Sequence, residues 1–180
     1  MKSFLCGMLW LVVSSAAFAD PCTDSIPERI GQLLVQQFPE ERLPLSTDTD
    51  EQIRKIEERN GHRCLLVTTS DFNADGQSDW ALLLPSRKGG GYRLVAVVSQ
   101  GKGYAVSSLL TWSGTYENMS LSVALPGVHR HTDAYAYSPE PGAVESLDTR
   151  RHGFYFGQEE AAASAYFLTA RGWVFVREMD

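Results

Sequence analysis

The sequence predicts an α+β fold in which two N-terminal helices pack on an antiparallel β meander, formed as a twisted sheet or a small barrel. Two observations predict it. Before Gly61 apolar residues recur at helical spacing, and after Gly61 the chain changes to short β-type runs separated by turns. The sequence shows no repeat and no composition shift after residue 19, so we expect residues 20–180 to form a single domain.

Residues 1–19 have the pattern of a cleaved secretory signal peptide. Lys2 supplies the positive start, residues 4–13 are apolar, and Ala17-Phe18-Ala19 is a small-x-small cleavage site. The apolar run is too short to span a bilayer. We therefore expect cleavage before Asp20, a periplasmic or secreted location in a bacterium, and no stable membrane insertion of the mature chain.

The charge balance limits the classes of partner. Lys2 is the only charged residue before Asp20, so the mature chain would keep 15 of the 16 basic residues against 22 acidic ones, a net charge of −7. Nucleic acids and anionic membrane surfaces need clustered Lys and Arg. The sequence therefore predicts no nucleic-acid partner, whereas cation binding is compatible with its charge.

Two helices are predicted at the start of the mature chain. The first begins at Ile26-Pro27 and is stopped by Pro39. The second is capped by Asp48 or Asp50, uses Ile53 and Ile56 as apolar contacts, and ends at Asn60-Gly61. Both should present an apolar stripe to the sheet.

The β-type runs follow Gly61. We predict strands at 64–69, 80–84, 92–99, 104–110, 121–124, 134–137, 154–170 (broken) and 173–177. The connections among the first four are short and rich in glycine, such as Gly89-Gly90-Gly91, which favours antiparallel neighbours.

Two of the three cysteines, Cys22 and Cys64, remain after signal cleavage. In an oxidising compartment this pair is expected to form one disulfide, which would join the N-terminus to the first strand; two free thiols are the alternative. The sequence contains no CxxC or CxxCH, the motifs of redox catalysis and haem attachment.

One loop has the spacing of a calcium site, Asp71-Phe-Asn73-Ala-Asp75-Gly76-Gln77-Ser-Asp79. Oxygen-bearing side chains occupy its first, third, fifth and ninth positions, and the seventh, Gln77, can supply its backbone carbonyl. Ca²⁺ takes six to eight such oxygens. Because turns also favour Asp, Asn and Gly, a polar hairpin turn without metal is the alternative.

The loop resembles the calcium loops of FG-GAP and VCBS-type repeats, which occur in integrin-like β-propellers. The resemblance covers residues 63–84 and implies Asp71, Asn73, Asp75, Gln77 and Asp79 as ligands. An EF-hand would place a bidentate Glu where this chain has Leu82. With one copy only, the resemblance implies the chemistry of the loop and not a propeller. We expect modest affinity and a structural ion.

Other candidate sites have weaker patterns. His129, His131 and Asp133 could form a metal site on one strand face, but nearby Pro126-Gly127 favours an exposed loop. Glu140 and the pair Glu159-Glu160 could act as catalytic carboxylates, although surface carboxylates are the common case. Aromatic residues between Trp112 and Tyr116 could contact a protein or a sugar ring.

These observations predict an exported calcium-binding protein without enzymatic activity. Its partner would be a protein of the cell envelope, and an inhibitor or immunity-type role is one example. The alternative is a calcium-dependent hydrolase of cell-wall or carbohydrate material. A deep pocket with converging acidic residues and a His would favour the enzyme, and a flat aromatic patch the binding protein.

Overall fold

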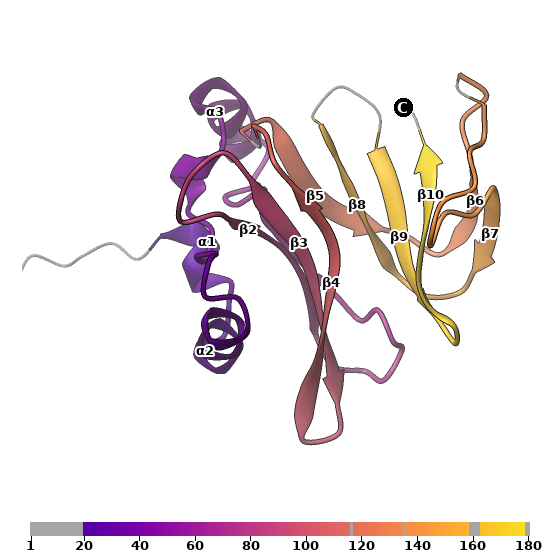
Figure 1. Ribbon diagram of the computed structural model, residues 1–180, viewed down its shortest axis with the longest axis horizontal. Helices are drawn as coiled ribbons and strands as arrows, with labels where there is room; N and C mark the ends of the chain where they lie inside the picture. The colour runs from indigo at the N-terminus through magenta and orange to yellow at the C-terminus, as the bar shows by residue number, and fades with distance from the viewer. Residues whose placement is uncertain (1–19, 116, 135, 159–162, 179–180) are drawn as a thin grey trace, which may run out of the picture.

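Two four-stranded antiparallel sheets and a two-stranded ribbon form the frame of the protein (Figure 1). The computed structural model describes residues 20–115, 117–134, 136–158 and 163–178. The prediction of an antiparallel, β-rich fold is confirmed. The predicted signal peptide lies outside the described residues, so its cleavage stays a prediction.

The first sheet is a meander, as the short connections predict. Its strands are β1 (Val67–Ser70), β2 (Asp79–Pro85), β3 (Tyr92–Gln100) and β4 (Gly103–Trp112), in the order β1-β2-β3-β4. Every residue of β2 is buried. This follows from the position of β2, because the sheet is covered on both faces.

The second sheet was not predicted. It has the order β10-β9-β8-β5 and consists of β5 (Met119–Ala124), β8 (Gly153–Gln158), β9 (Ala163–Thr169) and β10 (Gly172–Glu178). A ribbon of β6 (Gly127–Arg130) and β7 (Ser146–Thr149) lies between β5 and β8 in the chain. The strand predicted at 134–137 is wrong: Ala134 is in a turn, Tyr137 is outside any strand, and residue 135 is not described.

Side chains from both sheets meet in the main core. The cluster includes Leu83 and Leu94 from the first sheet and Leu121, Phe154 and Phe156 from the second. The sheets join at one edge, where the Leu121 N–H donates to the Leu65 carbonyl at 2.7 Å. A second cluster lies on the opposite face of the first sheet, under the N-terminal helices.

The N-terminal segment departs from the predicted pair of helices. It contains α1 (Pro21–Asp24), α2 (Glu28–Gln37), the 3-10 turn η1 (Ser46–Asp48) and α3 (Glu51–Arg59). Helix α2 buries Ile30 and Leu34 against the first sheet. Helix α3 has no buried residue, and the side chain of Ile56, predicted as an apolar contact, is 54% exposed.

Local interactions account for α3 without packing. The Asp50 carboxylate accepts from the N–H groups of Gln52 and Ile53, which caps the helix. Ion pairs join Lys55 to Glu51 and Arg54 to Glu58, each one helical turn apart. Among the described residues, no helix is long and apolar enough to cross a membrane.

The predicted disulfide between Cys22 and Cys64 is confirmed. Cys22 lies in α1 and is fully buried, and Cys64 precedes β1, which begins three residues later than predicted. The bond therefore fixes the helical segment to the chain that enters the first sheet.

Asp20 caps α1 and also holds η1. Its carboxylate accepts from the Cys22 N–H and from both the N–H and the hydroxyl of Ser46, at 2.7–3.0 Å. Burial raises the pKa of Asp20, but these hydrogen bonds outweigh it and hold the pKa below the ordinary 3.8. Ionised Asp20 thus contributes stability above pH 3.8, and this contribution is lost as the pH falls further.

We expect Asp20→Ala to lower the free energy of unfolding by about 1 kcal/mol at pH 7, the usual value of an N-cap. The difference from wild type should be smaller at pH 3, because below pH 3.8 the unfolded wild-type chain takes up a proton at Asp20 before the folded protein does. Urea unfolding at both pH values measures this difference in the free energy of unfolding. Asp24→Ala, which removes an exposed carboxylate, is the control. An equal loss in both variants, or no dependence on pH, would show that Asp20 has no such role.

Candidate metal centre

The loop predicted to bind calcium joins β1 to β2, and the pairing of Ser70 with Asp79 closes its base. Two of its residues have left-handed backbone conformations, Ala74 with φ of 62° and Gly76 with φ of 81°. Glycine tolerates this conformation, whereas alanine costs about 1–2 kcal/mol there. Interactions of the neighbouring side chains with the loop backbone must offset that cost.

Oxygen atoms of Asp71 and Asn73 converge on one backbone N–H. The Asp75 N–H donates to Asp71 Oδ1 at 3.0 Å and to Asn73 Oδ1 at 2.9 Å. The Gly76 N–H donates to Asp71 Oδ2 at 2.8 Å. The first and third positions of the loop therefore present their oxygens together, toward the turn at 74–76.

Asp75 and Ser99 connect the loop to β3. The Ser99 hydroxyl donates to Asp75 Oδ2 at 2.8 Å, and Asn73 Nδ2 donates to the same oxygen at 3.0 Å and to the Ser99 carbonyl at 2.9 Å. The hydrogen bond from Ser99, with those from Asn73 and Gln77, lowers the pKa of Asp75. Asp75 is exposed and ionised at neutral pH.

Asp79 lies on the inner side of the loop and is fully buried. Its Oδ2 accepts from the N–H groups of Phe72 at 2.7 Å and Asn73 at 3.2 Å, and its Oδ1 accepts from the Ser99 N–H at 2.7 Å. Burial raises the pKa of Asp79 despite these hydrogen bonds. The ninth position therefore fixes the backbone of the loop to β3.

Phe72, the second residue of the loop, is an anchor in the main core. Its ring is fully buried and lies 5.5 Å from the ring of Phe154 and 5.8 Å from that of Trp173, both in the second sheet. The base of the loop is therefore held by apolar packing on one side and by the hydrogen bonds of Asp79 on the other.

The donor set of the loop fits a hard cation. Each carboxylate or amide oxygen has two lone pairs, so Asp71 and Asn73 keep acceptor capacity beyond the hydrogen bonds described. Within the described residues, no three His, Cys, Asp or Glu side chains are grouped so that they could hold a metal ion. The expected donors also include the Asn73 amide and the Gln77 carbonyl, so the loop depends on neutral oxygens as well as carboxylates.

Sequence reasoning missed Ser99. It follows the loop by 20 residues, and no local motif marks it. Only the register of β2 with β3 brings Ser99 to Asp75 and Asp79. Gln77 is exposed, and its N–H donates to Asp75 Oδ1 at 2.8 Å.

His129 does not lie in the exposed loop that the sequence predicted. His129 is on β6 and only 7% exposed, and it contacts Glu178 at 3.0 Å and the Leu125 carbonyl at 3.0 Å. His131 instead contacts the Thr132 carbonyl, and Asp133 is exposed. The ribbon formed by β6 turns His129 inward, which the nearby Pro-Gly pair did not indicate.

The remaining candidates lie apart from the loop. Glu140 forms an ion pair with Arg177, and Trp112 is exposed at the end of β4. Tyr116, Glu159 and Glu160 are outside the described residues. In comparisons with protein-family models, curated proteins and solved structures, nothing matches this chain.

Proposed function

We propose that this chain is an exported calcium-binding protein of the bacterial cell envelope, with a structural ion and a non-enzymatic role in binding another protein. The convergence of the Asp71 and Asn73 oxygens on the Asp75 N–H supports the calcium site, because this arrangement gathers possible ligand oxygens around one turn. Asp71, Asn73, Asp75 and Asp79 and the Gln77 carbonyl are the proposed ligands. Asp71, Asp75 and Asp79 lie in one nine-residue loop, so a bound cation would offset their negative charge.

The ion would stabilise the fold instead of switching it. The loop is held at its base by Phe72 and Asp79, so little of the chain is left to rearrange when a cation binds. With an affinity in the 10⁻⁴–10⁻³ M range of extracellular modules, 10 mM Ca²⁺ adds about 1.4–2.7 kcal/mol of stability.

Thermal unfolding tests the calcium site. The oxidised mature protein should melt roughly 3–10 °C higher in 10 mM Ca²⁺ than in EDTA, given the usual response of domains of this size. Asp75→Ala should abolish the difference. Asp133→Ala, which removes an exposed carboxylate outside the loop, is the matched control and should keep it.

Two results would contradict the calcium site. One is an unchanged melting temperature together with no calcium in elemental analysis of the purified protein. The other is an equal loss of the calcium effect in Asp133→Ala. An unchanged melting temperature with one calcium per chain would instead show that EDTA had not removed the ion, and the site would stand.

The binding role is tested separately by crosslinking the protein in the envelope of cells that export it. A discrete adduct, heavier than the chain itself and lost on competition with excess unlabelled protein, is expected. Its absence would count against a protein partner and leave the calcium result unaffected. The acidic balance of the chain argues against nucleic acid as the partner.

A further inference from the structure

The two sheets form one open row of strands with a free edge at β4. They join through β1 and β5, so the row runs from β4 at one end to β10 at the other. The edge of β10 is occupied, because Phe175 exchanges backbone hydrogen bonds with Gly142 and Val144. Among the described residues, none pairs with the outer edge of β4. This ten-residue strand contains no charge and no proline, two of the usual protections of an edge.

A β-bulge in β4 redirects the end of this strand. Ser108 pairs with Val95 and Leu110 pairs with Leu94, so Leu109 is the extra residue. Directly paired residues point to the same face of a sheet, and Leu94 belongs to the core between the sheets whereas Val95 belongs to the helix side. The bulge therefore brings both Leu109 and Leu110 to the face between the sheets.

Trp112 is turned by the same shift. It pairs with Tyr92, which belongs to the core between the sheets. Without the extra residue, the alternation of side chains would place Leu110 and Trp112 on the helix side. Bulges commonly redirect side chains next to functional sites, and here the redirected residues line a cavity.

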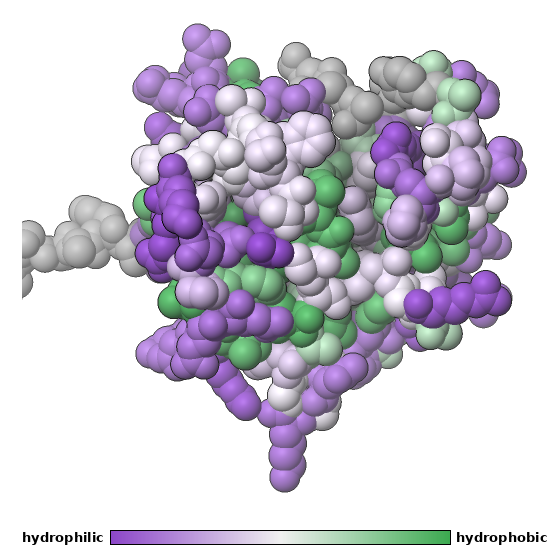
Figure 2. Space-filling view, in the orientation of Figure 1, coloured by the Kyte–Doolittle hydropathy of each residue, from purple (hydrophilic) through white to green (hydrophobic). Residues whose placement is uncertain are grey.

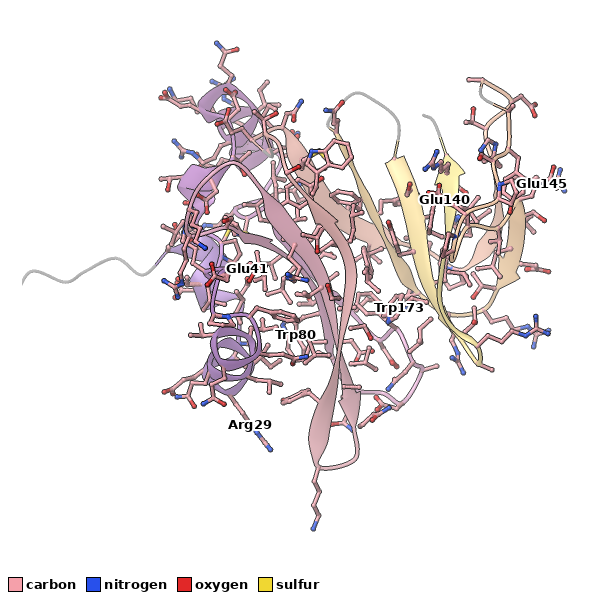
Figure 3. All side chains as sticks on the ribbon, in the orientation of Figure 1. Arg29, Glu41, Trp80, Glu140, Glu145 and Trp173 are labelled. Carbon is pink, nitrogen blue, oxygen red and sulfur yellow. A yellow bond between two sulfur atoms is a disulfide. The ribbon has the colours of Figure 1, made fainter. Side chains whose placement is uncertain are left out.

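That cavity has a volume of about 660 Å³ and lies between β4 and the strands β8, β9 and β10. Its apolar wall includes Leu110, Phe156, Tyr166 and Phe175. At its mouth are Trp112, whose side chain is 54% exposed, and the ion pair of Glu140 with Arg177. Figure 2 shows hydrophobic residues gathered in the middle of this face, and Figure 3 places Glu140 on the β9–β10 side.

We infer that β4 and this cavity are the docking site for an extended peptide segment of the partner protein. The segment would add a strand to the edge of β4 and insert one apolar or aromatic side chain beside Trp112. The inference rests on the binding role proposed above. This mode of recognition takes its affinity from main-chain hydrogen bonds and its specificity from a pocket for alternate side chains.

Two features select this occupant. An edge strand recognises another strand through its N–H and C=O groups, and the neutral β4 together with the mutually paired Glu140 and Arg177 suits an uncharged, apolar segment. A second copy of the chain fits less well. Two β4 strands paired about a two-fold axis would place two bulges at Leu109 in one ladder, whereas an added peptide would meet only one.

The test uses a displayed library of random twelve-residue peptides, panned on the oxidised mature protein. Selected peptides should carry apolar or aromatic residues at alternate positions. Trp112→Ala should weaken their binding at least tenfold, whereas Val128→Ala, which truncates a similarly exposed residue on β6, should not. N-methylation of every second backbone amide of a selected peptide should abolish binding for one alternating set and spare it for the other, because only one edge of an added strand faces β4.

Several results would overturn this docking site. They are the failure of the library to yield binders, peptides that bind Trp112→Ala unchanged, and equal effects of the two methylated sets. A concentration-dependent dimer in sedimentation equilibrium that Trp112→Ala abolishes would assign the edge to a second copy instead. None of these results bears on the calcium melts or the envelope crosslinking, so the proposed function can stand when the docking site fails.

Discussion

Replacing Asp79 with alanine should lower the free energy of unfolding by about 3–5 kcal/mol, because three backbone N–H groups lose their acceptor. Those of Phe72 and Ser99 are buried, and that of Asn73 is partly buried. A loss of this size should already appear in EDTA, since these hydrogen bonds involve no ion, and the loss of a proposed ligand should add to it in calcium. Burial raises the pKa of Asp79, so keeping this carboxylate ionised at neutral pH costs folding free energy and works against the contribution of its hydrogen bonds.

Chemical denaturation of Asp79→Ala and Asp75→Ala in EDTA provides the comparison. Removing the exposed Asp75 carboxylate without calcium should cost much less than removing Asp79, because water can replace its hydrogen bonds with Asn73 and Gln77. Equal losses for the two variants would mean that Asp79 has no special structural role. A loss for Asp79→Ala that appears only with calcium would make it simply a metal ligand.

Removing the disulfide is the second large perturbation. The bond joins residues 42 positions apart, and closing such a loop restricts the unfolded chain by about 4 kcal/mol on the chain-entropy model. The double variant Cys22→Ala/Cys64→Ala should therefore lose about that much stability, together with a smaller contribution from the buried Cys22 side chain.

Reduction of the wild-type protein separates these contributions. Urea unfolding with and without a thiol reductant should show a large loss for wild type and none for the double variant. A wild-type protein that is equally stable when reduced would show that the buried contacts of α1 and α2, and not the covalent bond, hold the helical segment on the sheet.

The sequence predicted the features that short connections or a count of cysteines determine. The first sheet followed from short glycine-rich connections, and the disulfide followed from the two cysteines left after the expected signal cleavage. The second sheet could not be predicted in this way. Strand β5 pairs with β8 across the β6–β7 ribbon, and hydrophobic periodicity carries no information about which distant strands pair.

The loop at residues 71–79 shows the same limit on a smaller scale. Its own spacing marks Asp71, Asn73 and Asp75 as candidate ligands, whereas Ser99 reaches Asn73 and Asp75 only through the register of β3. The burial of Asp79 follows from that register as well. In β4, one extra residue turns Leu110 and Trp112 to the opposite face of the sheet. The sequence pattern predicted this strand, but it could not show which of its side chains face the cavity.

Ser99 connects the two sites at which binding is proposed, the calcium loop and the edge strand β4. It contacts both Asp75 and Asp79, and it pairs directly with Tyr104 at the start of β4. The loop and the edge strand are therefore joined through a single hairpin. If calcium tightens this hairpin and so favours an added strand, linkage requires the strand to favour calcium by the same factor. A protein built this way would hold its ion most firmly when its partner is bound.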